Sequence, residues 1–377
     1  MRNLNRDYFE NHYGVEAEFL NDVQDLMDNQ KWVEMPIRSM QIKNLPDVPM
    51  LIGTDDMMLD GVKVTEHESI AETMSHIGLI LETAGENYLM RASAYDSLLQ
   101  RASISGRSIH RFFQEKKHVF IDFINQCLEM YGEQAQCLVR GGRIAGILSR
   151  DYCRLDQTLL FEGAFKKLAD RFGQYDFKEG LIAEEYTSCI LELNPSKEMY
   201  VCLEKQMQKW GANEIIPTVR LTTSDLGKSH ARLTPQLKTE KGQMIGYGKP
   251  LDVKHIGKKT EDDFIQLVEV VYPLFNETVA RIQELENETF YYPKTVLTEL
   301  FKKYKVSQKI ANLTIEKMIE MEGEGSINGA SLYYAMCDTL DVARLDGIKG
   351  LELLFLEDTI GKMLLDNWIR YDYPENK

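Results

Sequence analysis

The feature that most constrains the fold is a segment in which two β-forming runs flank a glycine pair, Gln136–Ser149. Gly141 and Gly142 both tolerate the positive φ values that a two-residue hairpin turn requires. The segment therefore predicts an antiparallel hairpin and places a sheet in the core of the protein.

Periodicity predicts the other elements. Apolar residues at helical spacing indicate helices, and runs of β-branched and aromatic residues between turn signals indicate strands. The expected helices are 8–29, 66–126 and 156–168, and Asp156 or Thr158 is expected to cap the N-terminus of the third. Further helices are expected from Thr260 to the end of the chain. The first of these should kink near Pro273. The expected strands lie in 32–64, including a hairpin at 57–64, and at 180–193, 199–203 and 215–223.

These elements predict an α+β fold, with a mixed or antiparallel sheet core, flanking helices and a helical C-terminal region. A chain of 377 residues is long enough for more than one domain. We expect an N-terminal α+β region at 1–135, a strand-rich central region at 136–259 and a helical region at 260–377.

Charge is distributed unevenly along the chain. The net charge is −15, yet residues 217–259 hold nine basic and three acidic side chains, a net charge of +6, so the remainder carries −21. Clustered Lys and Arg are what phosphate contacts need, and aromatic rings add stacking platforms for single strands. The residues expected to contact single-stranded DNA are Arg140, Arg143, Arg150, Arg154, Lys228, His230, Arg232, Lys238, Lys241, Tyr247, Lys249, Lys254, Lys258 and Lys259. The alternative is that these cations are surface residues balanced by nearby acids.

Two further segments have the outline of a helix-turn-helix, in which a second helix enters a DNA groove. The first is Ser93–Phe113, with Arg107, His110 and Arg111 on its second helix. The second is Leu297–Met318, around Lys305-Val-Ser-Gln-Lys309. A plain helical hairpin packed on the core explains either segment equally well by periodicity.

No sequence motif predicts an enzyme. The chain has no phosphate-binding G-x-x-x-x-G-K-[ST] loop and no H-E-x-x-H or G-x-S-x-G motif. Asp56, Asp60 and Gly61 match part of a calcium loop, but Met58 and His67 stand where carboxylates are required. The six cysteines are scattered, as in reduced cytoplasmic proteins, so we expect no metal, no cofactor and, on balance, no catalytic activity.

The N-terminus has no apolar stretch of the kind found in secretory signals, and no run of about 18 apolar residues predicts a membrane span. We therefore expect a cytoplasmic protein without membrane contact.

Three segments together resemble a family of phage and plasmid proteins of unknown function. They are 91–106 (RASAYDSLLQRASISG), 137–156 (CLVRGGRIAGILSRDYCRLD) and 221–230 (LTTSDLGKSH), in the order of that family. The family's Cys-Asn-Gly element is replaced here by Lys241-Gly-Gln-Met-Ile-Gly246. The resemblance implies a mobile element in a bacterial host and a place among its replication or recombination genes.

Charge and resemblance lead to one main hypothesis and two alternatives. The main hypothesis is a nucleic-acid-binding accessory protein of phage or plasmid DNA metabolism, including an oligomeric factor that anneals single-stranded DNA. The first alternative is an interaction protein whose acidic surface blocks a basic host factor, because such a surface imitates nucleic acid. The second is an enzyme acting on nucleotides or nucleic acid through residues distant in sequence.

Overall fold

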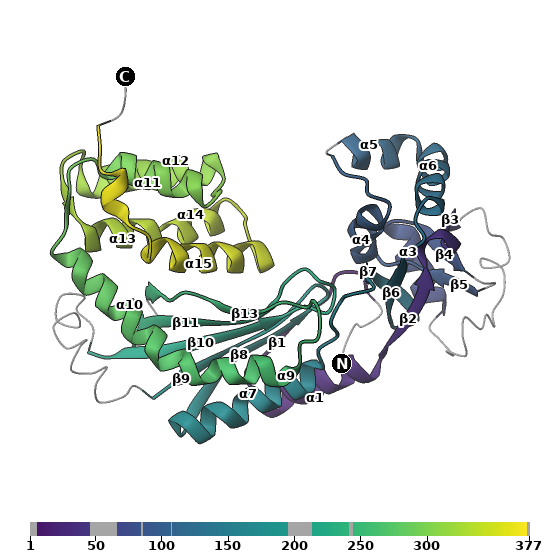
Figure 1. Cartoon of the computed structure of the whole chain (residues 1–377), viewed down its shortest axis with the longest axis horizontal. Coiled ribbons are helices and arrows are strands. Elements are labelled where there is room, and N and C mark those ends of the chain that lie inside the picture. The colour runs from purple at the N-terminus through teal and green to yellow at the C-terminus, as the bar shows by residue number, and fades with distance from the viewer. Residues whose placement is uncertain are drawn as a thin grey trace.

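The computed structural model describes residues 6–45, 66–83, 86–106, 108–194, 213–240 and 244–374. It has an α+β fold with antiparallel sheets and a helical C-terminal part, which confirms the predicted fold class. Three hydrophobic clusters divide the described chain into an N-terminal unit, a central unit and a C-terminal unit. In Figure 1 the N-terminal and C-terminal units lie at opposite ends of the central sheet.

The central unit is built on an antiparallel sheet in the order β1-β8-β9-β10-β11-β12, with β13 also paired to β11. Its strands are β1 (Glu10–Tyr13), β8 (Tyr175–Ala183), β9 (Thr187–Leu193), β10 (Ile215–Thr223), β11 (Ala231–Thr239), β12 (Met244–Tyr247) and β13 (Leu251–Val253). Its helices are α1 (Glu16–Asp28), α7 (Gln157–Phe172), α9 (Glu261–Ile265) and α10 (Val271–Glu286).

The two faces of this sheet differ in polarity because side chains alternate along each strand. In β10, Val219 and Leu221 belong to the hydrophobic core, which α1, α7 and α10 complete below the sheet in Figure 1. Thr218, Arg220 and Thr222 alternate with them and form part of the opposite, polar face, although all three are buried. The C-terminal unit lies on this polar face (Figure 1).

Local sequence explains how two of these helices begin. Asp156 caps α7, as predicted, because its carboxylate accepts a hydrogen bond from the Leu159 N–H at 3.1 Å. Thr260 and Asp263 form a capping box at the start of α9. A 3-10 segment at 266–270 then separates α9 from α10, so the expected break near Pro273 falls a few residues before that proline.

The N-terminal unit contains two three-stranded sheets, in the orders β2-β6-β7 and β3-β4-β5. Their strands are β2 (Gln30–Pro36), β3 (Gln41–Asn44), β4 (Leu79–Thr83), β5 (Glu86–Leu89), β6 (Gln134–Arg140) and β7 (Arg143–Ser149). Its helices are α3 (Glu66–Ser75), α4 (Ser93–Arg101), α5 (Ser108–Glu115) and α6 (Lys117–Glu129).

The predicted hairpin 136–149 is confirmed as β6 and β7, and Gly141 and Gly142 have φ values of 56° and 73°. Two other predictions were wrong. The region 66–126 is not helical throughout, since β4 and β5 interrupt it. The region 8–29 begins with a strand, because β1 adds to the edge of the central sheet before α1 starts. The predicted hairpin 57–64 and strand 199–203 lie outside the described residues.

The hydrophobic clusters also divide the chain differently from the predicted domain boundaries. Phe9 and Phe19 pack in the central unit, although they precede the N-terminal unit in sequence. The hairpin strands β6 and β7 pack instead in the N-terminal unit, where Cys137 and Ile147 join its core. The chain therefore enters the central unit, leaves it and returns.

In the described part of the chain, the C-terminal unit consists of five α-helices, a 3-10 helix at Trp368–Tyr371 and a two-stranded sheet. They are α11 (Pro293–Lys303), α12 (Gln308–Glu322), α13 (Gly329–Cys337), α14 (Thr339–Leu345), α15 (Gly350–Leu364), β14 (Thr289–Phe290) and β15 (Ile327–Asn328). α15 lies nearest the sheet, and α11 and α12 lie on the far side (Figure 1).

Gly361 allows α15 to approach the backbone that follows β12. A Cβ atom on Gly361 would lie 2.2 Å from the carbonyl oxygen of Gly248, which is backbone and moves little. We expect Gly361→Ala to lower the free energy of unfolding by about 1–3 kcal/mol, measured by urea denaturation. Gly132→Ala is the control, because a Cβ there meets no atom within 4 Å. Equal stability of the two variants would contradict the close packing.

Candidate nucleic-acid interface

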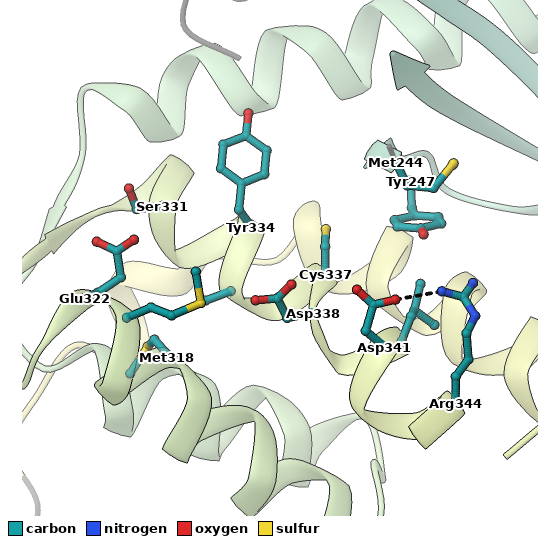
Figure 2. A pocket seen from close by; sticks show the side chains of 13 residues that line it. Met244, Tyr247, Met318, Glu322, Ser331, Tyr334, Cys337, Asp338, Asp341 and Arg344 are labelled. Carbon is teal, nitrogen blue, oxygen red and sulfur yellow. Dashed lines mark hydrogen bonds and ion pairs between the residues drawn. The ribbon is translucent and has the colours of Figure 1, made fainter. Parts of the chain in front are cut away.

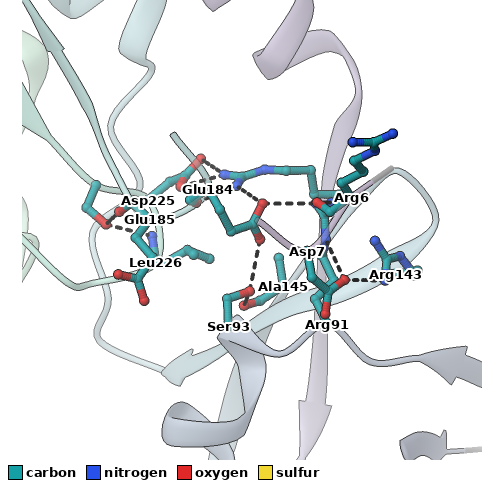
Figure 3. Close-up of polar contacts among 12 residues, drawn as sticks. Arg6, Asp7, Arg91, Ser93, Arg143, Ala145, Glu184, Glu185, Asp225 and Leu226 are labelled. Carbon is teal, nitrogen blue, oxygen red and sulfur yellow. Dashed lines mark hydrogen bonds and ion pairs between the residues drawn. The ribbon is translucent and has the colours of Figure 1, made fainter. Parts of the chain in front are cut away.

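The two hairpin arginines expected to contact DNA lie in the interior. Arg140 is 1% exposed and Arg143 is 0% exposed, so neither guanidinium reaches a phosphate at the surface. Both belong to a buried cluster of three arginines and three carboxylates, shown in part in Figure 3. We call it the buried ion cluster; its members are Asp7, Arg91, Arg140, Arg143, Glu184 and Asp225.

Arg140 is held by two residues of the central unit. Its Nη2 donates to both carboxylate oxygens of Asp225 at 2.7 Å, and its Nη1 donates to the carbonyl oxygen of Glu184 at 2.8 Å. Burial lowers the pKa of Arg140, but Asp225 and Glu184 outweigh it, so the pKa lies above its ordinary value. Burial raises the pKa of Glu184, although Arg91 and Arg140 oppose this.

The other half of the cluster forms around Asp7. Arg143 donates to the Asp7 carboxylate and to the Thr73 hydroxyl, the latter at 3.3 Å. Arg91 contacts Glu184 across 3.3 Å, and burial lowers the pKa of Arg91 to about 10. Because Arg91 and Arg143 belong to the N-terminal unit and Glu184 to the central unit, the cluster joins these two units. Arg140 and Arg143 therefore have a structural role, and the prediction that they contact DNA was wrong.

A second buried ion cluster fixes the C-terminal unit to the sheet. Asp358 of α15 accepts from Arg220 at 2.8 Å, from Arg232 at 2.6 Å and from the Thr234 hydroxyl at 2.9 Å. Glu357 also contacts Arg220. Two cations from the basic segment are thus neutralised by a helix more than a hundred residues away in sequence, which no local pattern indicates.

Most of the remaining expected DNA-binding residues are also paired. Arg154 contacts Glu34, Lys228 contacts Asp96 and Glu185, His230 contacts Asp252, Lys238 contacts Glu192, and Lys259 contacts Asp263. Tyr247 is buried, and Lys241 lies outside the described residues. Arg150, Lys249, Lys254 and Lys258 are exposed and form no ion pair with another described residue. The basic segment is therefore largely neutralised within the molecule.

The hairpin and the basic segment lie in different sheets, so they do not form one continuous groove. They contact each other at several points, among them the Arg140–Asp225 ion pair and the antiparallel bridge between Tyr152 and Ile256. The antiparallel register of this bridge places Arg150 opposite Lys258. A small exposed group of cations is what remains of the expected site.

Tyr152 lies next to these cations in sequence, but its ring is already covered by other aromatic rings. The Tyr152 ring stacks on Trp32 at 5.7 Å and on His255 at 5.2 Å, so it is covered by two aromatic neighbours. Arg154 in turn covers the Trp32 ring at 5.0 Å. These contacts leave a base little room to stack on Tyr152.

The first helix-turn-helix candidate lacks the required geometry. Helices α4 and α5 are separated by residues 102–107, whereas a helix-turn-helix has a turn of three or four residues. The α5 residues Phe112 and Phe113 pack against the core of the N-terminal unit. This segment is a helical hairpin of the ordinary kind.

The second candidate has a turn as short as that of a helix-turn-helix. Only residues 304–307 separate α11 from α12, and Lys305 adopts a left-handed conformation with φ 59°. The Val306 N–H donates to the Phe301 carbonyl at 2.9 Å and the Lys305 N–H to the Lys302 carbonyl at 3.2 Å, the pattern of a Schellman motif. Ser307 then caps α12 by accepting from the Ile310 N–H.

This second segment presents polar and basic side chains to solvent. Residues 293–313 contain five lysines and one glutamate, a local excess that composition alone could have revealed. The exposed residues from the end of α11 to the first half of α12 are Lys302, Lys303, Lys305, Ser307, Gln308, Lys309, Asn312 and Leu313. Lys303 pairs with Asp366 and Lys309 with Asp346, while Lys302 and Lys305 form no ion pair with a described residue.

Comparison with known proteins gives no relative: no family model, no curated protein and no solved structure matches this chain. Within the described ranges, no helix is both long and apolar enough to cross a membrane. The same ranges contain no group of three or more His, Cys, Asp or Glu side chains arranged to hold a metal ion.

Proposed function

We propose that this protein binds double-stranded DNA through the helix-turn-helix formed by α11 and α12. The observation that carries the proposal is the four-residue turn with left-handed Lys305, which exposes the start of α12 beside four lysines. In this motif, residues at the N-terminal end of the second helix contact base edges. Gln308, Lys309 and Asn312 occupy those positions here.

The chemistry of these side chains suits duplex recognition. Glutamine and asparagine pair with adenine in the major groove, and lysine pairs with guanine. Lys302, Lys303 and Lys305 precede α12, where cations contact the phosphate backbone and add affinity that falls with salt. The resemblance of 91–230 to phage and plasmid proteins supports a role in the DNA metabolism of a mobile element in the bacterial cytoplasm. This proposal moves the expected DNA contact from the central segment to the C-terminal unit.

The test compares two triple alanine variants with equal changes in charge. One removes Lys302, Lys305 and Lys309; the other removes the exposed central cations Arg150, Lys254 and Lys258. Binding to a labelled DNA duplex and to a labelled single strand is measured by fluorescence anisotropy at several salt concentrations. We expect the first variant to weaken duplex binding by about tenfold or more. Its salt slope should fall by about 0.9 for each phosphate that the protein no longer neutralises.

The central variant is expected to bind the duplex within about twofold of the unchanged protein. If the central variant lost more duplex affinity than the α12 variant, the DNA interface would lie in the central segment instead. Tighter binding to single strands than to duplex would favour the annealing function instead. No binding at micromolar protein and about 50 mM salt would remove the proposal, since phosphate contacts act strongly there.

A further inference from the structure

The C-terminal unit contains a cavity that the proposed DNA interface does not use. Its volume is about 450 Å³, and it lies between the last turn of α12, helices α13 and α14, and strand β12 (Figure 2). Sites for small molecules have volumes of about 300–1,000 Å³ and combine apolar walls with a few polar groups. The size of this cavity therefore suits a small organic ligand.

Methionine forms much of the apolar wall. Met244, Met318 and Met321 all line the cavity, and they come from strand β12 and from the end of α12. Unbranched methionine side chains adapt to ligands of different shape and make favourable contacts with aromatic rings. The methionine wall therefore favours a ligand with an apolar body and accepts apolar groups of different shape.

The charged groups of the cavity are mainly acidic. Glu322, Asp338 and Asp341 line it together with a single cation, Arg344. Arg344 donates to Asp341 at 2.9 Å, and Asp338 contacts Lys317 across 3.2 Å. Glu322 is exposed and forms no ion pair within the part of the chain that the structure describes. Uncompensated negative charge at the edge of an apolar cavity favours a cation.

An independent observation comes from Tyr247. Its side chain is only 2% exposed and lines the cavity, and Figure 2 shows its hydroxyl directed toward Asp341 and Arg344. The backbone N–H of Tyr247 donates to the Tyr333 hydroxyl at 2.9 Å, but the Tyr247 hydroxyl has no hydrogen bond to another described residue. A tyrosine hydroxyl that faces a cavity without a partner from the protein can accept a hydrogen bond from a ligand.

From these observations we infer that the cavity binds a small organic ammonium ion with an apolar body. The ammonium group would lie beside Asp338 and Asp341, on the side of the cavity nearer Tyr247 in Figure 2, and donate to the Tyr247 hydroxyl oxygen. Glu322, at the opposite end, would add attraction over a longer distance, and the apolar body would contact the methionines. Aromatic faces also attract cations, so Tyr247 and Tyr334 add to the preference for positive charge. This inference does not depend on DNA binding.

The test uses three probes of similar shape and different charge: 4-phenylbutylamine, 4-phenylbutanol and 4-phenylbutyrate. Binding to the full-length protein is measured by isothermal titration calorimetry. We expect the amine to bind with a dissociation constant below about 1 mM, the alcohol to bind about tenfold more weakly, and the carboxylate to give no heat. Equal affinity for amine and alcohol, or no binding of the amine at about 1 mM, would overturn the inference.

Variants of the cavity provide the second arm of the test. The double variant Glu322→Gln/Asp338→Asn is expected to weaken amine binding about tenfold and to leave alcohol binding unchanged. Tyr247→Phe is expected to weaken both the amine and the alcohol, because both donate to the hydroxyl oxygen. Glu324→Gln is the matched control, since this exposed glutamate lies two residues beyond Glu322 and outside the cavity. If Glu324→Gln weakened amine binding as much as the double variant does, the binding would reflect general attraction to the acidic surface, and the proposed site would be refuted.

Discussion

Arg140→Met is expected to lower the free energy of unfolding by about 3–5 kcal/mol, the range seen when one partner of a buried ion pair is removed. Asp225 and Glu184 would keep their buried negative charges but lose the guanidinium that compensates them. The loss follows from the cost of an unpaired charge in a medium of low dielectric constant. The measurement is urea denaturation followed by circular dichroism.

A double variant separates the charge effect from the loss of packing. Arg140→Met/Asp225→Leu removes both partners of the bidentate pair and leaves Glu184 beside Arg91. We expect the double variant to be more stable than Arg140→Met alone, because fewer charges remain unpaired.

The control for Arg140→Met is Arg111→Met, whose partner Glu115 is exposed to solvent. Exposed pairs contribute about 0–1 kcal/mol. If Arg140→Met cost no more than this control, the buried ion cluster would not be what joins the N-terminal unit to the sheet.

Asp358→Asn is expected to have an effect of similar size at the other end of the molecule. The Asp358 carboxylate receives hydrogen bonds from both Arg220 and Arg232, and its replacement by a neutral amide leaves these two cations with only Glu357, which contacts Arg220. Burial already lowers the pKa of Arg220, and Asp358 is the main group that opposes this. We expect a loss of about 3–5 kcal/mol.

This second prediction has a local readout in a Trp32→Phe/Trp210→Phe background, because the remaining tryptophan, Trp368, is fully buried in the C-terminal unit. We expect the tryptophan fluorescence of Asp358→Asn to change at lower urea concentration than that of the unchanged protein. Glu352→Gln removes one negative charge from an exposed position of the same helix and should leave the transition unchanged. A transition shared by both variants would show that Asp358 does not fix α15 to the sheet.

Features governed by neighbouring residues were predictable from the sequence. Gly141 and Gly142 determine their own turn, because few residues other than glycine adopt two successive positive φ values. Asp156 and Thr260 mark helix starts for a similar reason, since their side chains reach N–H groups only three residues away. The fold class follows from such local signals.

The interface was harder to predict because charge along a chain does not specify burial. Arg140 and Arg220 look the same in sequence as exposed arginines, and only their partners from distant segments identify them as interior groups. The segment 79–89 was missed for a related reason. Its short apolar run fits a helix or a strand equally well, and the choice depends on pairing with β3.

Local sequence was enough to specify the α+β class, the hairpin at 141–142, the capped starts of α7 and α9, and the uneven distribution of charge. Which cations are neutralised and which remain exposed was settled only by folding in three dimensions, because ion pairs form between residues as much as 138 positions apart. The tertiary structure also decided the length and conformation of the turns in the two helix-turn-helix candidates, because both depend on how the helices pack on the core.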